Sequence, residues 1–243
     1  MAEFKLEPLP FEEAIEFFKN KLPLTPQDYD RLSFEARTKA FTISGVAALD
    51  VLHDIYQELL KALETGATIE DFRKNANTIL EKKGWRGLTP YRTDNIFRTN
   101  IQTAYNVGRY RQMTDPNVLK MRPYWRYDAV DDQKTRPSHR ALDNKVYPAD
   151  HPFWDTWYPP NGFRCRCSVE SLTESQVKRR SLEVSTDIPQ YVTPPDTKLP
   201  IPLNPDPGFA HNPAKVEWQP DLKKYPAAFR KAYEARARKG GDA

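Results

Sequence analysis

The residues with the greatest capacity for chemistry lie in the middle of the chain, between positions 124 and 168. This stretch holds both cysteines, Cys165 and Cys167, and two of the four histidines, His139 and His151. Two thiolates and two imidazoles can bind zinc tetrahedrally. The order His-x11-His-x13-Cys-x-Cys differs from the common finger spacings. The four residues are a candidate zinc site; the alternative is that the cysteines are plain small residues and the histidines bond to the backbone.

A second kind of chemistry is open to the same stretch. Carboxylates that hold Mg²⁺ and a histidine that activates water are the parts of a metal-dependent nuclease. Residues of these types are Asp131, Asp132, His139, His151 and Asn161. An Asp-Asp pair is equally suited to open a turn, so the same residues also fit a structural unit without catalysis. A metal-dependent nuclease is the alternative to that structural interpretation.

The composition excludes several classes of protein. The chain has 243 residues, 39% of them hydrophobic, with a formal net charge of +4. Its mean hydropathy is −0.77 and its pI is near 8.9, which permits contact with nucleic acid without requiring it. No apolar run approaches the roughly 20 residues that span a bilayer, and the N-terminus has acidic residues where an export signal needs basic ones. Two cysteines this close would form a strained disulfide, so we expect a reducing compartment.

Capped turns divide the first half of the chain into helices. Thr25-Pro26 and Thr89-Pro90 each place a cap residue before a proline at the first helical position, and Thr68 opens a capping box. The 3.6-residue apolar period predicts helices over residues 11–22, 26–43, 46–63, 69–83 and 90–113. We expect these helices to form a scaffold or docking module, because nothing in them resembles a catalytic motif.

One side of the last of these helices carries a row of mostly basic residues. Such a row is typical of a face exposed to solvent, and the alternative is a surface for an acidic partner, protein or DNA. The row consists of Arg92, Arg98, Gln102, Arg109 and Arg111.

From Pro123 onward the pattern changes to short strands separated by turns. Aromatic and β-branched residues predict strands over 124–130, 145–147 and 164–169, and a short helix follows at 173–180. A small unit of this kind buries little apolar area, so a metal staple would stabilise it.

A proline-rich segment follows this unit. Nine prolines between positions 187 and 220 exclude a helix or a central strand and predict an extended arm, anchored by Tyr191, Phe209 and Trp218. The end of the chain reads as a helix whose basic residues are either a solvated terminus or contacts to DNA phosphates. These residues are Lys223, Lys224, Arg230, Lys231, Arg236, Arg238 and Lys239.

Together these patterns predict an α+β protein in three parts. Residues 1–121 form a helical docking region, and residues 122–186 form a small β-rich core unit. Residues 187–243 form the proline-rich arm and the basic C-terminal helix.

Several short motifs in this order carry a resemblance to a known family. They are Arg98-Thr99-Asn100, Asp131-Asp132, Pro137-Ser138-His139, the Pro-Phe-Trp-Asp run at 152–155, and Pro-Pro-Asn-Gly followed by Cys-Arg-Cys at 159–167. Between about residues 92 and 213 the chain resembles the Mu F-like minor head proteins of tailed bacteriophages, the head-morphogenesis family.

This resemblance implies a structural, non-enzymatic protein of the phage head. It implies a position inside the virion near the portal vertex, with assembly in the host cytoplasm, and a role in head morphogenesis and in genome packaging or delivery. The implied partners are the portal protein, the major capsid or scaffolding protein, and packaged DNA. Many members carry an additional Cys-x-x-Cys that supports a zinc site; here only His139 could substitute for that pair.

Overall fold

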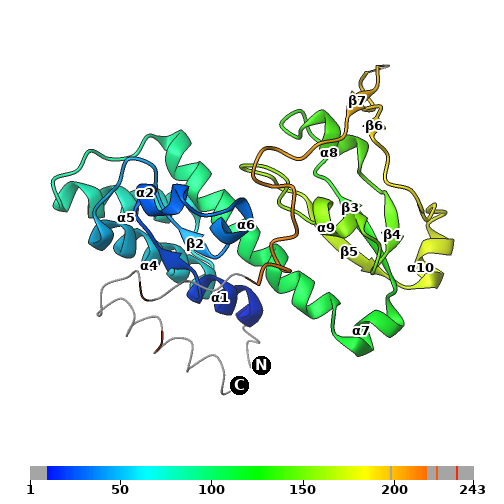
Figure 1. Cartoon of the computed structure of the whole chain (residues 1–243), viewed down its shortest axis with the longest axis horizontal. Coiled ribbons are helices and arrows are strands. Elements are labelled where there is room, and N and C mark those ends of the chain that lie inside the picture. The colour runs from blue at the N-terminus through cyan, green and yellow to red at the C-terminus, as the bar shows by residue number, and fades with distance from the viewer. Residues whose placement is uncertain (1–9, 198, 218–222, 224–233, 235–243) are drawn as a thin grey trace, which may run out of the picture.

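The computed structural model describes residues 10–197, 199–217, 223 and 234. Figure 1 shows a mainly helical part beside a part built around a small sheet. Helices and a few strands are both present, as expected for an α+β protein. Within the described residues, no helix combines the length and the apolar character needed to cross a bilayer.

The helical part is organised around four helices whose apolar faces share one core. Two of them start at the predicted capping signals: Thr68 and Asp71 form a reciprocal capping box, and the Thr89 side chain accepts from the Arg92 backbone N–H. Gly66 ends α4 (Leu49–Thr65) in the left-handed conformation, with φ of 70°. Residues with a Cβ rarely adopt this conformation. The helices are α1 (Glu12–Lys19), α4 (Leu49–Thr65), α5 (Ile69–Lys82) and α6 (Pro90–Met113).

The prediction of one helix over 26–43 is wrong. The segment forms two short helices, α2 (Pro26–Asp30) and α3 (Phe34–Arg37), followed by the strand β2 (Ala40–Phe41). Ser33 causes the restart, because its hydroxyl accepts from the Ala36 backbone N–H as an N-cap. Strand β2 then pairs in parallel with β1 (Leu22–Pro23), a long-range contact that no local pattern reports.

The second part is a three-stranded antiparallel sheet in the order β4-β3-β5. The central strand β3 (Tyr124–Asp128) alternates in burial, and it turns Trp125 and Tyr127 into an aromatic core. The flanking strands are β4 (Val146–Pro148) and β5 (Ser168–Leu172), and the short helices around the sheet are α7 (Pro116–Met121), α8 (Pro137–Ala141), α9 (Phe153–Trp157) and α10 (Glu174–Arg179).

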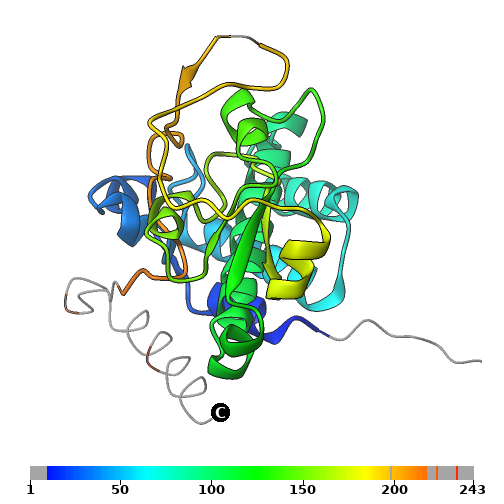
Figure 2. The ribbon, with the colours of Figure 1, turned by 90° about the vertical axis from the view of Figure 1, so that its right-hand side faces the viewer.

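The proline-rich arm is extended, and part of it forms a small hairpin. Strands β6 (Tyr191–Val192) and β7 (Ile201–Pro202) pair antiparallel, and their hairpin projects from the molecule in both views (Figures 1 and 2). Tyr191 is 61% exposed and is not an anchor, contrary to the prediction. Val192 and Leu203 are buried in its place. Residues 203–217 then return to the junction of the two parts, where Asn212 donates to the carbonyl of Trp154.

Candidate metal centre

His139 is held inside the sheet part by a short helix. Helix α8 begins with Pro137 at its first position, where the missing N–H costs nothing. The His139 side chain is 2% exposed and its ring meets Trp157 edge-on at 6.3 Å. The imidazole therefore points into the aromatic core, away from solvent.

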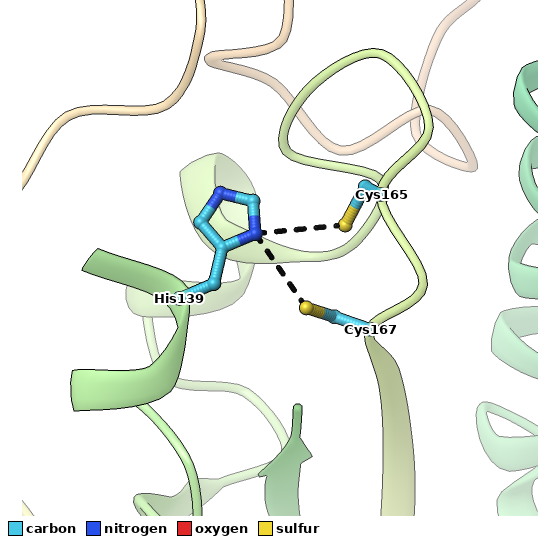
Figure 3. A group of neighbouring side chains, drawn as sticks. All are labelled: His139, Cys165 and Cys167. Atoms are coloured by element: carbon cyan, nitrogen blue, oxygen red, sulfur yellow. Dashed lines mark hydrogen bonds between the residues drawn. The ribbon is translucent and has the colours of Figure 1, made fainter. Parts of the chain in front are cut away.

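The two cysteines lie on the loop that leads into β5. The predicted strand over 164–169 is wrong in position, because β5 begins only at Ser168. Arg164 has a positive φ of 59°, and the Cys165 N–H donates to the carbonyl of Gly162. Residues two positions apart in extended backbone point to the same side, and both thiols of the Cys-x-Cys pair face the same imidazole, as Figure 3 shows.

The three side chains form a compact set of metal ligands. The Nδ1 atom of His139 lies 3.7 Å from Cys165 Sγ and 3.5 Å from Cys167 Sγ, and all three donor atoms lie within 4.8 Å of one another. A zinc ion with bonds of about 2.3 Å to sulfur and about 2.0 Å to nitrogen places neighbouring ligands roughly 3.5 Å apart. The donor types and the nitrogen–sulfur distances thus fit three corners of a zinc tetrahedron.

The two thiols share a proton unequally. A hydrogen bond from Cys167, together with the His139 ring, lowers the pKa of Cys165 well below its ordinary value. The same bond and burial raise the pKa of Cys167. Cys165 is therefore the first of the two thiols to lose its proton, as a metal ligand must.

The cysteine loop is fixed from both sides. Its Cys167 carbonyl accepts from the side chains of Gln102 (2.9 Å) and Asn106 (3.2 Å) on α6. Arg166, between the cysteines, makes two hydrogen bonds to Asp132, and this guanidinium holds the pKa of the Asp132 carboxyl well below its usual range. The geometry of the loop is therefore set before any ligand arrives.

His151 does not belong to the metal cluster, although the sequence suggested it as the fourth ligand. Its Nε2 lies 3.0 Å from the carbonyl of Thr186, and its Nδ1 accepts from the Phe153 N–H. Both ring nitrogens are engaged, and the ring packs against Tyr147 at 4.8 Å. Among the described His, Cys, Asp and Glu residues, only His139, Cys165 and Cys167 group as metal ligands here.

The residues required for a nuclease are also separated. Asp132 is engaged by Arg166, and Asp131 is exposed. Asn161 is buried, and its side-chain oxygen accepts from the Tyr127 hydroxyl at 2.8 Å. These side chains serve as structural contacts, so the described geometry provides no carboxylate and histidine set around a common point.

The basic row on α6 is used within the molecule, which the sequence did not reveal. Arg109 donates to the carbonyl of Val169, Arg111 pairs with Glu16, and Arg92 donates to the carbonyl of Ser44. Polar residues on this helix therefore join α1, α6 and β5. The row of basic residues is ambiguous in the sequence, because a helix face that binds carbonyl groups has the same composition as a face exposed to solvent.

Comparison with known proteins places this chain in a family. Residues 53–170, which include all three metal ligand candidates, match the family described as phage Mu protein F like protein. "Putative capsid assembly protein F" of Escherichia phage Mu is 38% identical over 194 residues, covering 73% of this chain and 44% of the relative. The "Mu-like prophage FluMu F protein" of Haemophilus influenzae is 39% identical over 170 residues, covering 65% and 40%. No solved structure matches.

The chain belongs to the phage Mu protein F-like family. It spans less than half the length of each of these two relatives. A more distant similarity, 26% identity over 117 residues, extends to an uncharacterized protein of Methanocaldococcus jannaschii.

Proposed function

We propose that this chain is a non-enzymatic structural protein of a tailed-phage head that acts in head morphogenesis. The observation that carries this proposal is the 38% identity over 194 residues to a relative named for capsid assembly. The geometry is consistent with it. His139, Cys165 and Cys167 of the sheet part are buried and in contact with one another, and such an arrangement stabilises a unit without offering a surface for turnover.

The finer role concerns position in the virion. We infer that the chain lies inside the head near the portal vertex and assembles there from the host cytoplasm. Its partners would be the portal protein and the major capsid or scaffolding protein. Genome packaging or delivery would then depend on it indirectly, through the architecture of the vertex.

A co-sedimentation experiment tests this role. The purified chain should sediment with assemblies of the portal protein from the same phage or prophage, and it should not sediment alone. Mass spectrometry of purified particles should detect it beside the portal protein. Absence from particles, or sedimentation that does not depend on the portal protein, would contradict the proposal.

The cofactor proposed for the sheet part is a structural zinc ion. His139, Cys165 and Cys167 would hold it, and their nitrogen–sulfur distances fit that ion. When bound, it would join α8 to the loop before β5 as a staple. The fourth position would be filled by water or by a group other than His151.

Direct contact with packaged DNA is a separate proposal that concerns the basic C-terminal residues. Of the seven predicted contacts, only Lys223 lies among the described residues. If this region binds phosphates, affinity for duplex DNA should fall steeply with salt, and removal of residues 223–243 should abolish it. An affinity for DNA that does not depend on salt concentration, or that is unchanged by the truncation, would exclude this contact. Mg²⁺-dependent cutting of the same DNA would favour the nuclease alternative.

A further inference from the structure

A cavity of about 490 Å³ opens where the helical part, the sheet part and the arm meet. We call it the junction pocket. Its volume falls within the range typical of ligand-binding clefts. Its walls come from segments far apart in sequence and include Lys21, Phe34, Arg37, Thr99, Phe163 and Phe209.

Lys21 is the most unusual residue of the junction pocket. Its side chain is 5% exposed, and among the described residues no carboxylate pairs with it. Its ammonium instead lies over the rings of Phe17 and Phe18, at 5.4 and 6.0 Å. Burial and the nearby Lys39 lower its pKa to about 7. A buried, unpaired cation is costly, so an anion that reached Lys21 would be strongly favoured.

Other polar groups in the junction pocket also have unused bonding capacity. The Nε atom of Arg37 and the hydroxyl of Thr42 are buried without a hydrogen-bond partner in the structure. The lining contains three cationic side chains, Lys21, Arg37 and Arg92, and a single carboxylate, that of Asp30. Their formal charges leave an excess of two positive charges when Lys21 is protonated. The pocket is therefore complementary to an acidic ligand.

The edge of the junction pocket is aromatic and exposed. Phe34 is 53% exposed and Phe163 is 54% exposed, which is unusual for rings of this size. Arg37 lies over the Phe34 ring at 5.0 Å, and Phe163 meets Phe209 edge-on at 5.0 Å. Aromatic rings and an arginine around a concave site are typical of a binding hot spot in a protein interface.

We propose that the junction pocket binds an acidic peptide segment of a partner protein. A carboxylate of that segment would lie beside Lys21, and a neighbouring apolar side chain would pack against Phe34 and Phe163. A duplex phosphate backbone fits less well, because Lys21 lies at 5% exposure inside a cavity while phosphates are read by exposed cations. The inference does not depend on the role in head assembly, since it can be tested with the purified chain.

Fluorescence anisotropy with two labelled peptides tests the proposal. One peptide alternates leucine and glutamate, and the other replaces every glutamate by glutamine. The glutamate peptide should bind, and the glutamine peptide should bind at least about tenfold more weakly. Lys21→Met should weaken binding of the glutamate peptide by about tenfold or more, because it removes a desolvated partner of the carboxylate.

Lys39→Met is the matched control. Lys39 lies over the same Phe17 ring, also at 5.4 Å, but does not line the junction pocket; this variant should not lose binding, because it removes only a like charge from beside Lys21. Equal binding of the two peptides, equal loss in both lysine variants, or no binding at millimolar peptide would each overturn the proposal. So would tighter, Lys21-dependent binding of a single-stranded oligonucleotide, which would assign the pocket to nucleic acid.

Discussion

At the scale of single residues, the ring of His139 faces both thiols of the sheet part. Its Nδ1 lies within 3.7 Å of each sulfur, and its Nε2 is buried without a hydrogen-bond partner in the structure. A neutral imidazole that coordinates a metal through Nδ1 keeps its proton on Nε2. Nδ1 is therefore the ring nitrogen placed to bind a metal, although ligating histidines usually also donate their second N–H to an acceptor.

The zinc proposal predicts the metal content of two variants. The wild-type chain should contain near-stoichiometric zinc. Cys165→Ser should lose the zinc and His151→Ala should retain it, because Cys165 belongs to the ligand set and His151 does not. Elemental analysis measures this content. EDTA should lower the thermal midpoint of the wild-type chain but not that of Cys165→Ser. Zinc that persists in Cys165→Ser, or a wild-type chain without zinc, would exclude the site.

Lys21 predicts a pH dependence of stability. Its pKa is lowered from 10.5 to about 7 by burial, so between these values the unfolded chain binds more protons than the folded chain, and stability rises with pH. Lys21→Met removes the buried charge. It should raise the free energy of unfolding at pH 7, and its advantage should shrink toward pH 10.5. Urea unfolding at several pH values measures this difference; a constant difference would contradict the assignment.

At the scale of elements, α6 is the centre of the fold. It packs on α1, α4 and α5 in the helical core, and its polar residues reach the loop before β5. Close approach to α1 depends on Gly108, because a Cβ there would lie 2.8 Å from the Ala14 backbone nitrogen and 2.8 Å from the Phe11 ring. The glycine is thus required by packing, not by a turn.

Gly108→Ala should therefore destabilise the chain despite the higher helix propensity of alanine. Overpacking of this kind costs about 1–3 kcal/mol, whereas propensity returns about 1 kcal/mol. Chemical denaturation measures the net loss. Gln112→Ala, an exposed position on the same helix, should change stability by less than about 0.5 kcal/mol. An unchanged or increased stability of Gly108→Ala would show that α1 can move away freely.

At the scale of the whole molecule, two cores meet along α6. Ala104 and Val107 belong to the helical core, and Met113 belongs to the aromatic core of the sheet part. Between them, Asn106 is fully buried. Its side-chain amide N–H donates to the Cys167 carbonyl, and its backbone carbonyl accepts from the Tyr158 hydroxyl at 2.9 Å. One residue therefore links both parts to the cysteine loop.

Asn106→Ala should weaken this link. Removal of one partner from a buried hydrogen bond costs about 1–3 kcal/mol, partly offset because Gln102 also donates to the same carbonyl. Urea unfolding followed by tryptophan fluorescence should show a lower midpoint, and Asn117→Ala, at an exposed position, should not. Equal midpoints for the two variants would mean that the junction is held by apolar contacts alone.

The sequence by itself determined the features that depend on neighbouring residues. Helix α6 begins at Pro90 and ends at Met113 as predicted, and α10 lies within the predicted range 173–180, because caps and helical periods are local interactions. The motifs from Arg98 to Cys167 likewise indicated the family that the comparisons confirm.

Only the tertiary structure decided the features that depend on distant contacts. It selected His139 over His151, because the fold brings α8, which carries His139, against the loop that carries both thiols. It also replaced the end of the predicted helix over 26–43 by β2, through pairing of β1 with β2, and it gathered Lys21 and Phe163 around one cavity. These three features depend on packing between segments that are far apart in the sequence. The local spacing of residues along the chain does not indicate which distant segments pack together.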